Sequence, residues 1–133
     1  MNFKINTKEK FTTITPLFEQ FADNITEELV KTAQSCLKTA PRNLILDLQN
    51  IKELQLENAA KILALQQEFY EQNASFVICN LNKEIAGQLE EEDILEMMNV
   101  TPTESEAWDI VQMEEIEREL LDDDSPEFNQ LPD

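Results

Sequence analysis

The stretch from residue 43 to residue 80 constrains the fold more than any other part of the sequence. It begins with a short, β-compatible apolar run and ends with a second one over residues 76–79, and such runs are typical of buried strands in a parallel sheet. Between them, apolar residues recur at spacings of three, four and seven, which is the period of one helix face. These apolar positions are Leu44, Ile45, Leu46 and Leu48 in the first run, and Ala59, Ile62, Leu63, Leu65, Phe69 and Tyr70 between the runs. The segment therefore predicts two parallel strands joined by a helix, a crossover that is almost always right-handed.

The first residues of the chain predict two more strands. Phe3 and Ile5 alternate with polar neighbours, and residues 11–15 are rich in threonine, which favours extended structure. Pro16 is expected to end the second strand, because proline cannot donate a backbone hydrogen bond.

Two capping-box patterns mark the starts of two further helices. Asn24 with Glu27 precedes a helix that Pro41 is expected to stop, and Thr103 with Glu106 precedes a helix running to about residue 121. One apolar stripe is expected to bind the last helix to the core. Its members are Ala107, Ile110, Met113, Ile116 and Leu120.

Several motifs of the sequence resemble those of the STAS domain, the module shared by anti-sigma factor antagonists and the cytoplasmic parts of sulfate transporters. Residues 46–51 (LDLQNI) have the form of the family's strand, and Gln55, Leu56, Glu57 and Asn58 follow, without gaps, at the four positions of its Asp-Ser-Ser-Gly loop. Further on, Ile85, Ala86 and Leu89 fit the family's short third helix, residues 97–100 its last weak strand, and residues 102–107 (PTESEA) the entry to its final helix.

The resemblance covers about residues 3–115 and implies an α/β fold. We expect a STAS-like domain over residues 1–121, with a mixed sheet of four to five strands, helices mainly on one face and an extended C-terminal helix. Residues 122–133 are acidic, contain Pro126 and Pro132, and are predicted to be a disordered tail.

The loop departs from the family pattern at every position. Family members use the second loop Ser as a phosphorylation switch, and Glu57 stands in its place; no Ser or Thr occurs between Thr39 and Ser75. A Glu has one negative charge and two acceptor oxygens, whereas phosphoserine has roughly −1.5 to −2 and three. Glu57 is thus either a partial imitation of the phosphorylated state or a carboxylate favoured at a helix start.

The resemblance implies a regulatory protein–protein interaction module. Its partner would be an anti-sigma factor or a serine kinase-like protein; alternatively, the protein is an accessory subunit docked on a membrane transporter's ATPase, which needs no switch Ser. The contact surface would be the loop and helix start. The predicted contact residues are Lys52, Glu53, Gln55, Leu56, Glu57, Asn58 and Lys61.

The sequence argues against catalysis. It has no His and only one glycine, Gly87, which excludes the usual hydrolase arrangements and glycine-rich phosphate loops. Its two cysteines are too few for an all-Cys zinc site. The acidic run 90–93 lacks the spacing of a calcium loop and is interpreted as a solvated helix end. We expect no enzyme activity, no cofactor and no metal.

Charge is unevenly distributed along the chain. Residues 1–82 hold 10 acidic and 8 basic residues, whereas residues 83–133 hold 18 acidic and 2 basic residues. Such a chain is repelled by nucleic acid and by anionic lipid. A basic protein partner stays open, and the alternative is that the acidic end of the chain is simply solvated.

No apolar segment approaches the roughly 18 residues of a membrane span, and the N-terminus lacks a signal-peptide core, so we expect a cytoplasmic protein. Cys36 and Cys79 are interpreted as core residues rather than a disulfide. Trp108 is interpreted as the edge of the core, with an exposed interface anchor as the alternative. Oligomeric state has no signal in the sequence.

Overall fold

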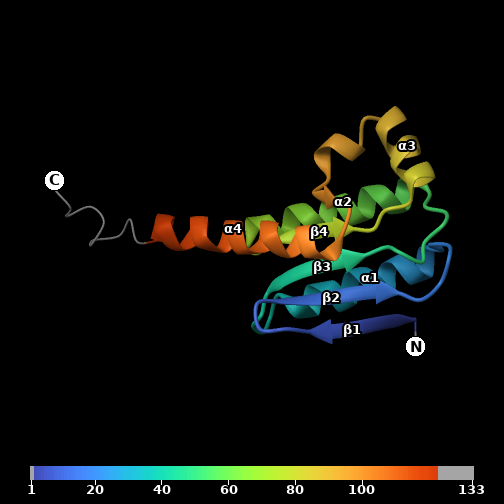
Figure 1. Cartoon of the computed structure of the whole chain (residues 1–133). Helices are drawn as coiled ribbons and strands as arrows, with labels where there is room; N and C mark the ends of the chain where they lie inside the picture. The colour runs from blue at the N-terminus through green and yellow to red at the C-terminus, as the bar shows by residue number, and fades with distance from the viewer. Residues whose placement is uncertain (1, 123–133) are drawn as a thin grey trace, which may run out of the picture.

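The computed structural model describes residues 2–122, which form a five-stranded sheet in the order β1-β2-β3-β4-β5 (Figure 1). β1 is antiparallel to β2, and all other neighbours are parallel. The strands are β1 (Phe3–Thr7), β2 (Phe11–Pro16), β3 (Asn43–Asp47), β4 (Phe76–Cys79) and β5 (Val100–Thr101). The helices are α1 (Asp23–Cys36), α2 (Leu56–Glu71), α3 (Lys83–Glu91), the 3-10 turn η1 (Leu95–Met97) and α4 (Glu104–Asp122).

The order of the strands explains where the helices lie. The chain moves across the sheet in one direction from β2 to β5, and right-handed crossovers then place α1, α2 and α3 on the same face. This face holds the larger core, which includes Leu44, Leu46, Phe76 and Ile78 from the central strands. The predicted fold class, a mixed sheet with helices mainly on one face and a long last helix, is confirmed.

The other face of the sheet is covered by α4. Ile45 and Val77 alternate with the residues of the larger core and pack against Ala107 and Val111 of α4. Trp108 packs edge to face on Phe11, with ring centroids 5.7 Å apart, and is half-buried at the margin of this second core. The central strands are therefore buried on both faces, which is why they read as continuous apolar runs in the sequence.

A polar cluster fixes the middle of α4 to the end of the sheet at which β3 and β4 begin. Glu114 Oε1 accepts hydrogen bonds from Tyr70 Oη (2.7 Å) and Ser75 Oγ (2.6 Å). Arg118 Nη2 donates to Asn43 Oδ1 (3.2 Å) and Ser75 Oγ (3.1 Å). These bonds set the rotation of α4 about its own axis, because only one side of the helix can present Glu114 and Arg118 to these partners.

The apolar stripe that the sequence predicts for the buried side of α4 is therefore only partly buried. Ala107 is buried, but Met113, Ile116 and Leu120 are exposed, and Val111, outside the stripe, is buried instead. The prediction for these three residues is wrong because the polar cluster turns them away from the sheet.

The capping predictions have opposite outcomes. Thr103 Oγ1 accepts from Glu106 N (3.2 Å) and donates to Glu106 Oε1 (3.1 Å), so the capping pair at the start of α4 is confirmed. The pair Asn24 and Glu27 is wrong, because α1 begins at Asp23 and its cap residue, Ala22, makes no side-chain capping bond. α1 also ends at Cys36, well before the proline expected to stop it.

The strand expected over residues 97–100 is wrong in its bounds. A side chain of α2 takes the backbone groups concerned: Gln66 Nε2 donates to Met97 O and Gln66 Oε1 accepts from Asn99 N, both at 2.9 Å. Only Val100 and Thr101 remain to pair with β4. Met98 is buried, whereas Met97 is exposed.

The remaining expectations concern the cysteines, the membrane and the tail. Cys36 and Cys79 are both free. No helix within residues 2–122 is long and apolar enough to cross a membrane. Of the predicted tail, Asp122 is the last residue of α4, and the rest lies outside the described residues.

Candidate functional site

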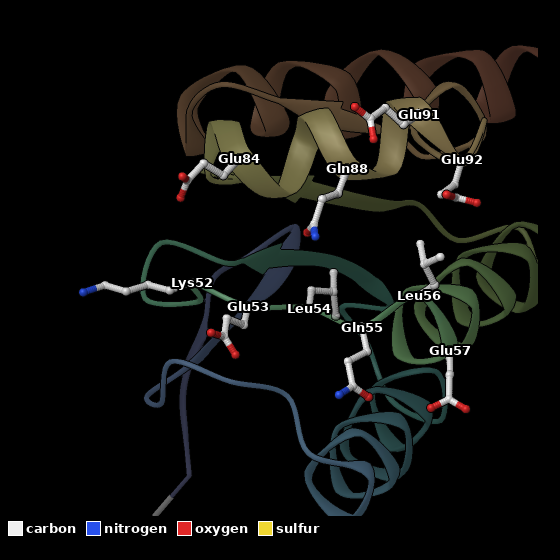
Figure 2. Close-up of a pocket in the computed structure, with 10 residues that line it drawn as sticks. All are labelled: Lys52, Glu53, Leu54, Gln55, Leu56, Glu57, Glu84, Gln88, Glu91 and Glu92. Carbon is white, nitrogen blue, oxygen red and sulfur yellow. The ribbon is translucent and has the colours of Figure 1, made fainter.

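The loop between β3 and α2 lies opposite α3, and the two enclose an open groove of about 890 Å³ (Figure 2). Both elements follow the carboxyl end of a parallel strand, the edge at which α/β folds commonly place binding sites. The groove is lined by Lys52, Glu53, Leu54, Gln55, Leu56 and Glu57 on one side and by Glu84, Gln88, Glu91 and Glu92 on the other.

Backbone hydrogen bonds hold the loop against the segment that follows β2. Lys52 N and Glu53 N both donate to Glu19 O, at 2.7 and 3.1 Å, and Phe21 N donates to Glu53 O at 3.4 Å. Leu54 is buried beneath the loop. The loop is therefore a fixed wall of the groove, even though its polar side chains are exposed.

The first turn of α2 continues this wall. Gln55 is the cap residue but makes no side-chain capping bond, and Leu56 and Glu57 are exposed. In Figure 2, Leu56 points toward α3, whereas Gln55 and Glu57 point away from it. Glu57 therefore stands at the rim of the groove, in the first turn where the helix dipole favours a carboxylate.

Asn58, the fourth residue of the predicted loop motif, lies beneath this surface. Its side chain is fully buried, and its Nδ2 donates to Phe21 O at 3.0 Å. Its Oδ1 has no hydrogen-bond partner among the described residues. Asn58 thus ties the start of α2 to the segment before α1, and it does not present a side chain to a partner.

The other wall of the groove is an amphipathic helix that is capped by its own sequence. Asn82 Oδ1 accepts from Glu84 N (2.6 Å) and Ile85 N (3.3 Å), which starts α3. Ile85 and Leu89 are buried, so the opposite side of α3 faces solvent. In Figure 2, Gln88 extends from α3 toward the loop.

The groove is strongly acidic. Five glutamates and one lysine line it, and Lys52 is also 3.5 Å from Glu19 in an exposed ion pair. Carboxylates gathered on two facing walls produce a negative potential that attracts cationic side chains. Within residues 2–122, no group of three or more His, Cys, Asp and Glu side chains is placed to hold a metal ion.

The structure brings together five of the seven predicted contact residues: Lys52, Glu53, Gln55, Leu56 and Glu57. Asn58 is buried, and Lys61 lies in a separate depression of about 440 Å³ between α1 and α2.

Sequence reasoning missed the α3 wall, because the acidic run at its end was interpreted as solvated. The helix itself was predicted, from Ile85, Ala86 and Leu89, and the asparagine cap after β4 marks its start, but its position opposite the loop has no local signal in the sequence.

Comparison with known proteins adds a fold assignment. No protein-family model and no curated protein sequence matches the chain. Solved structures do match, at low sequence identity. The anti-sigma factor antagonist SpoIIAA in its unphosphorylated form has a TM-score of 0.66 and 16% identity, over 83% of this chain and 96% of that one.

Two other solved structures also match this chain at low sequence identity. Moorella thermoacetica RsbS with a Ser-to-Glu substitution has a TM-score of 0.70 and 12% identity, over 84% of this chain and 96% of that one. The STAS domain of a SulP transporter from Vibrio cholerae has a TM-score of 0.62 and 19% identity, over 85% of this chain and 88% of that one. The protein therefore has the STAS-domain fold, as its sequence motifs predict.

Proposed function

We propose that this protein is a non-enzymatic regulatory module that binds a protein partner through the groove between the β3–α2 loop and α3. The observation that carries the proposal is the position of Glu57. It is exposed in the first turn of α2, at the rim of the groove, where the family that the sequence resembles has its phosphorylated Ser. The fold and the loop register together support a binding function.

Glu57 makes the charge at this position permanent. A switch Ser is neutral until it is phosphorylated, whereas a Glu side chain is ionised at neutral pH without any modification. The segment between Thr39 and Ser75 offers no other hydroxyl of the Ser or Thr type. Binding at this groove is therefore proposed to be independent of Ser phosphorylation, and Glu57 either imitates the phosphorylated state or contacts the partner directly.

The charge of the groove indicates the kind of surface that it binds. Five glutamates against one lysine favour a partner surface rich in Lys and Arg, and such pairing accelerates association more than it raises affinity. The resemblance suggests an anti-sigma factor or a serine kinase-like protein as this partner. We expect the complex to form in the cytoplasm.

The proposal is tested by calorimetric titration of a partner co-purified from native cells. Wild type is compared with Glu57→Ala and Glu57→Ser, and with Glu71→Ala, which removes an exposed carboxylate from the last turn of the same helix. If Glu57 imitates a phosphate that releases the partner, both Glu57 variants bind more tightly, by roughly 1 to 3 kcal/mol. If Glu57 is a contact, both bind more weakly. Equal affinities for all four proteins would show that Glu57 is only a helix-start carboxylate.

A second function is an accessory subunit docked on a transporter's ATPase. The missing loop hydroxyl favours it, because such a subunit needs no switch, and the SulP transporter domain from Vibrio cholerae has the same fold. Identification of the stoichiometric partner separates the two: a kinase or sigma regulator supports the first function and a transporter ATPase the second.

A further inference from the structure

An apolar stripe lies on the outer side of α4, far along the chain from the groove. Met113, Ile116 and Leu120 follow one another at helical spacings of three and four, so they share one face. Their exposed fractions are 58%, 56% and 59%, larger than that of any other large apolar residue in residues 2–122 except Leu121. Nothing within residues 2–122 covers this stripe, which we call the α4 stripe.

The α4 stripe is not a core surface that has failed to pack. The buried residues of α4, such as Ala107 and Val111, lie on the opposite side of the helix and face β3 and β4. Glu114 and Arg118 lie on that buried side as well, each seven residues after Ala107 or Val111, and their bonds to Tyr70, Asn43 and Ser75 hold the rotation of the helix. In Figure 1, α4 also runs on beyond the strands, so its C-terminal turns are open to a partner.

The charges around the stripe all have one sign. Asp109, Glu117 and Glu119 are exposed on α4. Glu117 borders the stripe, four residues after Met113, whereas Arg118, the one cation of α4, is turned inward and hydrogen-bonded. The outward surface of the helix is therefore an apolar stripe bordered by carboxylates.

Charge decides between the occupants that this surface could take. A second copy would bring its own acidic α4 against this one, and like charges in close contact cost several kcal/mol. Residues 123–133 of the same chain contain four acids and no base, so they carry the same sign. A cationic partner instead neutralises Glu117 and its neighbours while its apolar side chains cover the stripe.

We propose that the α4 stripe binds a cationic amphipathic helix of a partner protein. The stripe spans eight residues, about 12 Å along the helix axis, and matches a partner helix whose apolar anchors recur at three- and four-residue spacings. Lysine or arginine side chains beside those anchors pair with Asp109, Glu117 and Glu119. This second surface is separate from the groove, and its test does not depend on the proposed function of Glu57.

The test uses the full chain and a synthetic, fluorescently labelled leucine–lysine peptide of about four helical turns as the probe. A peptide of the same composition, scrambled so that no apolar face forms, is the peptide control. The protein variants are Ile116→Ser with Leu120→Ser, which removes the stripe, Glu117→Gln with Glu119→Gln, which removes charge, and Ile5→Ser with Leu17→Ser, which removes exposed apolar residues elsewhere. Thermal melting confirms that each variant is folded.

We expect the amphipathic peptide, but not the scrambled one, to bind wild type and the Ile5/Leu17 variant equally. The stripe variant should bind at least about tenfold more weakly, and the charge variant more weakly with less dependence on salt. Equal binding of both peptides, or of wild type and the stripe variant, would overturn the proposal, since only charge would then be recognised. A wild-type dimer that Ile116→Ser dissociates, seen by sedimentation, would also overturn it by showing that a second copy is the occupant.

Discussion

Tyr70 Oη donates a 2.7 Å hydrogen bond to Glu114 Oε1, which joins the last turns of α2 to the middle of α4 across the end of the sheet. The two helices cover opposite faces, so this bond connects the two cores of the protein. The same carboxylate oxygen also accepts from Ser75, just before β4. This shared acceptor fixes which side of α4 faces the sheet and which side is left for a partner.

Removal of this bond should destabilise the fold without changing its shape. Tyr70→Phe deletes the donor from a part-buried carboxylate, and we expect the free energy of unfolding to fall by about 1 to 2 kcal/mol. Urea denaturation measures this change in the free energy of unfolding. Glu119→Gln is the control, because that side chain is exposed on the same helix. If Tyr70→Phe and the control have equal stability, the bond does not hold α4 in place.

Stability should fall at alkaline pH because of a buried thiol. Burial, reinforced by the charges of Asp47 and Glu104, raises the pKa of Cys79 from its ordinary value of 9.0 to about 12. Because the folded pKa lies above the unfolded one, the contribution of the neutral Cys79 thiol to the free energy of unfolding is fully present below pH 9. It is lost as pH rises toward 12, by up to about 4 kcal/mol.

Urea denaturation across this pH range measures the loss. Cys79→Ala lowers the starting stability by leaving a small cavity, but it should flatten the decline between pH 9 and 12. An unchanged alkaline slope in the variant would assign the loss to other groups. Tyr70 is one such group, since burial and its bond to Glu114 raise its pKa above the ordinary 10.0.

A carboxylate in place of Asn58 should lower the free energy of unfolding strongly, although the loop motif in the sequence suggests an exposed position. Asn58→Asp exchanges the amide that donates to Phe21 O for a buried, ionised oxygen facing a carbonyl. We expect a loss of roughly 3 kcal/mol or more at neutral pH.

The loss should shrink as pH falls, because burial raises the folded pKa of the new group and its protonated form can again donate. Glu57→Gln, at the adjacent exposed position, serves as the control and should change stability by less than about 1 kcal/mol. Thermal melting at two pH values distinguishes them; equal losses would mean that Asn58 is not buried in solution.

The loop should not accept phosphate from a serine or threonine kinase. No Ser or Thr occurs between Thr39 and Ser75, and Ser75 itself is fully buried and bound to Glu114. Peptide mass spectrometry after incubation with the co-purified partner and ATP should find the segment unmodified in wild type. Phosphate on Ser75 would require local opening of the polar cluster and would contradict the arrangement described here.

Much of the fold follows from the sequence because its signals are local. The apolar runs of β3 and β4, the helical period of α2, and the Thr103 and Glu106 pair at the start of α4 each express a short-range physical preference. The register of the loop motif likewise put Glu57 at the start of α2, where the structure has it.

The features that were missed depend on contacts between distant segments. Asn58 is buried because Phe21, 37 residues earlier, offers it a carbonyl, and the strand expected at residues 97–100 is shortened because Gln66 takes its backbone groups. The glutamates of α3 belong to the groove only because the crossover brings that helix opposite the loop.

The sequence by itself determined which segments become strands and helices, because apolar period, capping residues and strand propensity act within a few neighbouring residues. Only the tertiary structure decided which of two apolar sides of α4 is buried. Both sides carry apolar residues, and the choice is made by Glu114 and Arg118, whose hydrogen-bond partners at Tyr70, Ser75 and Asn43 are assembled only when the sheet and α2 are in place.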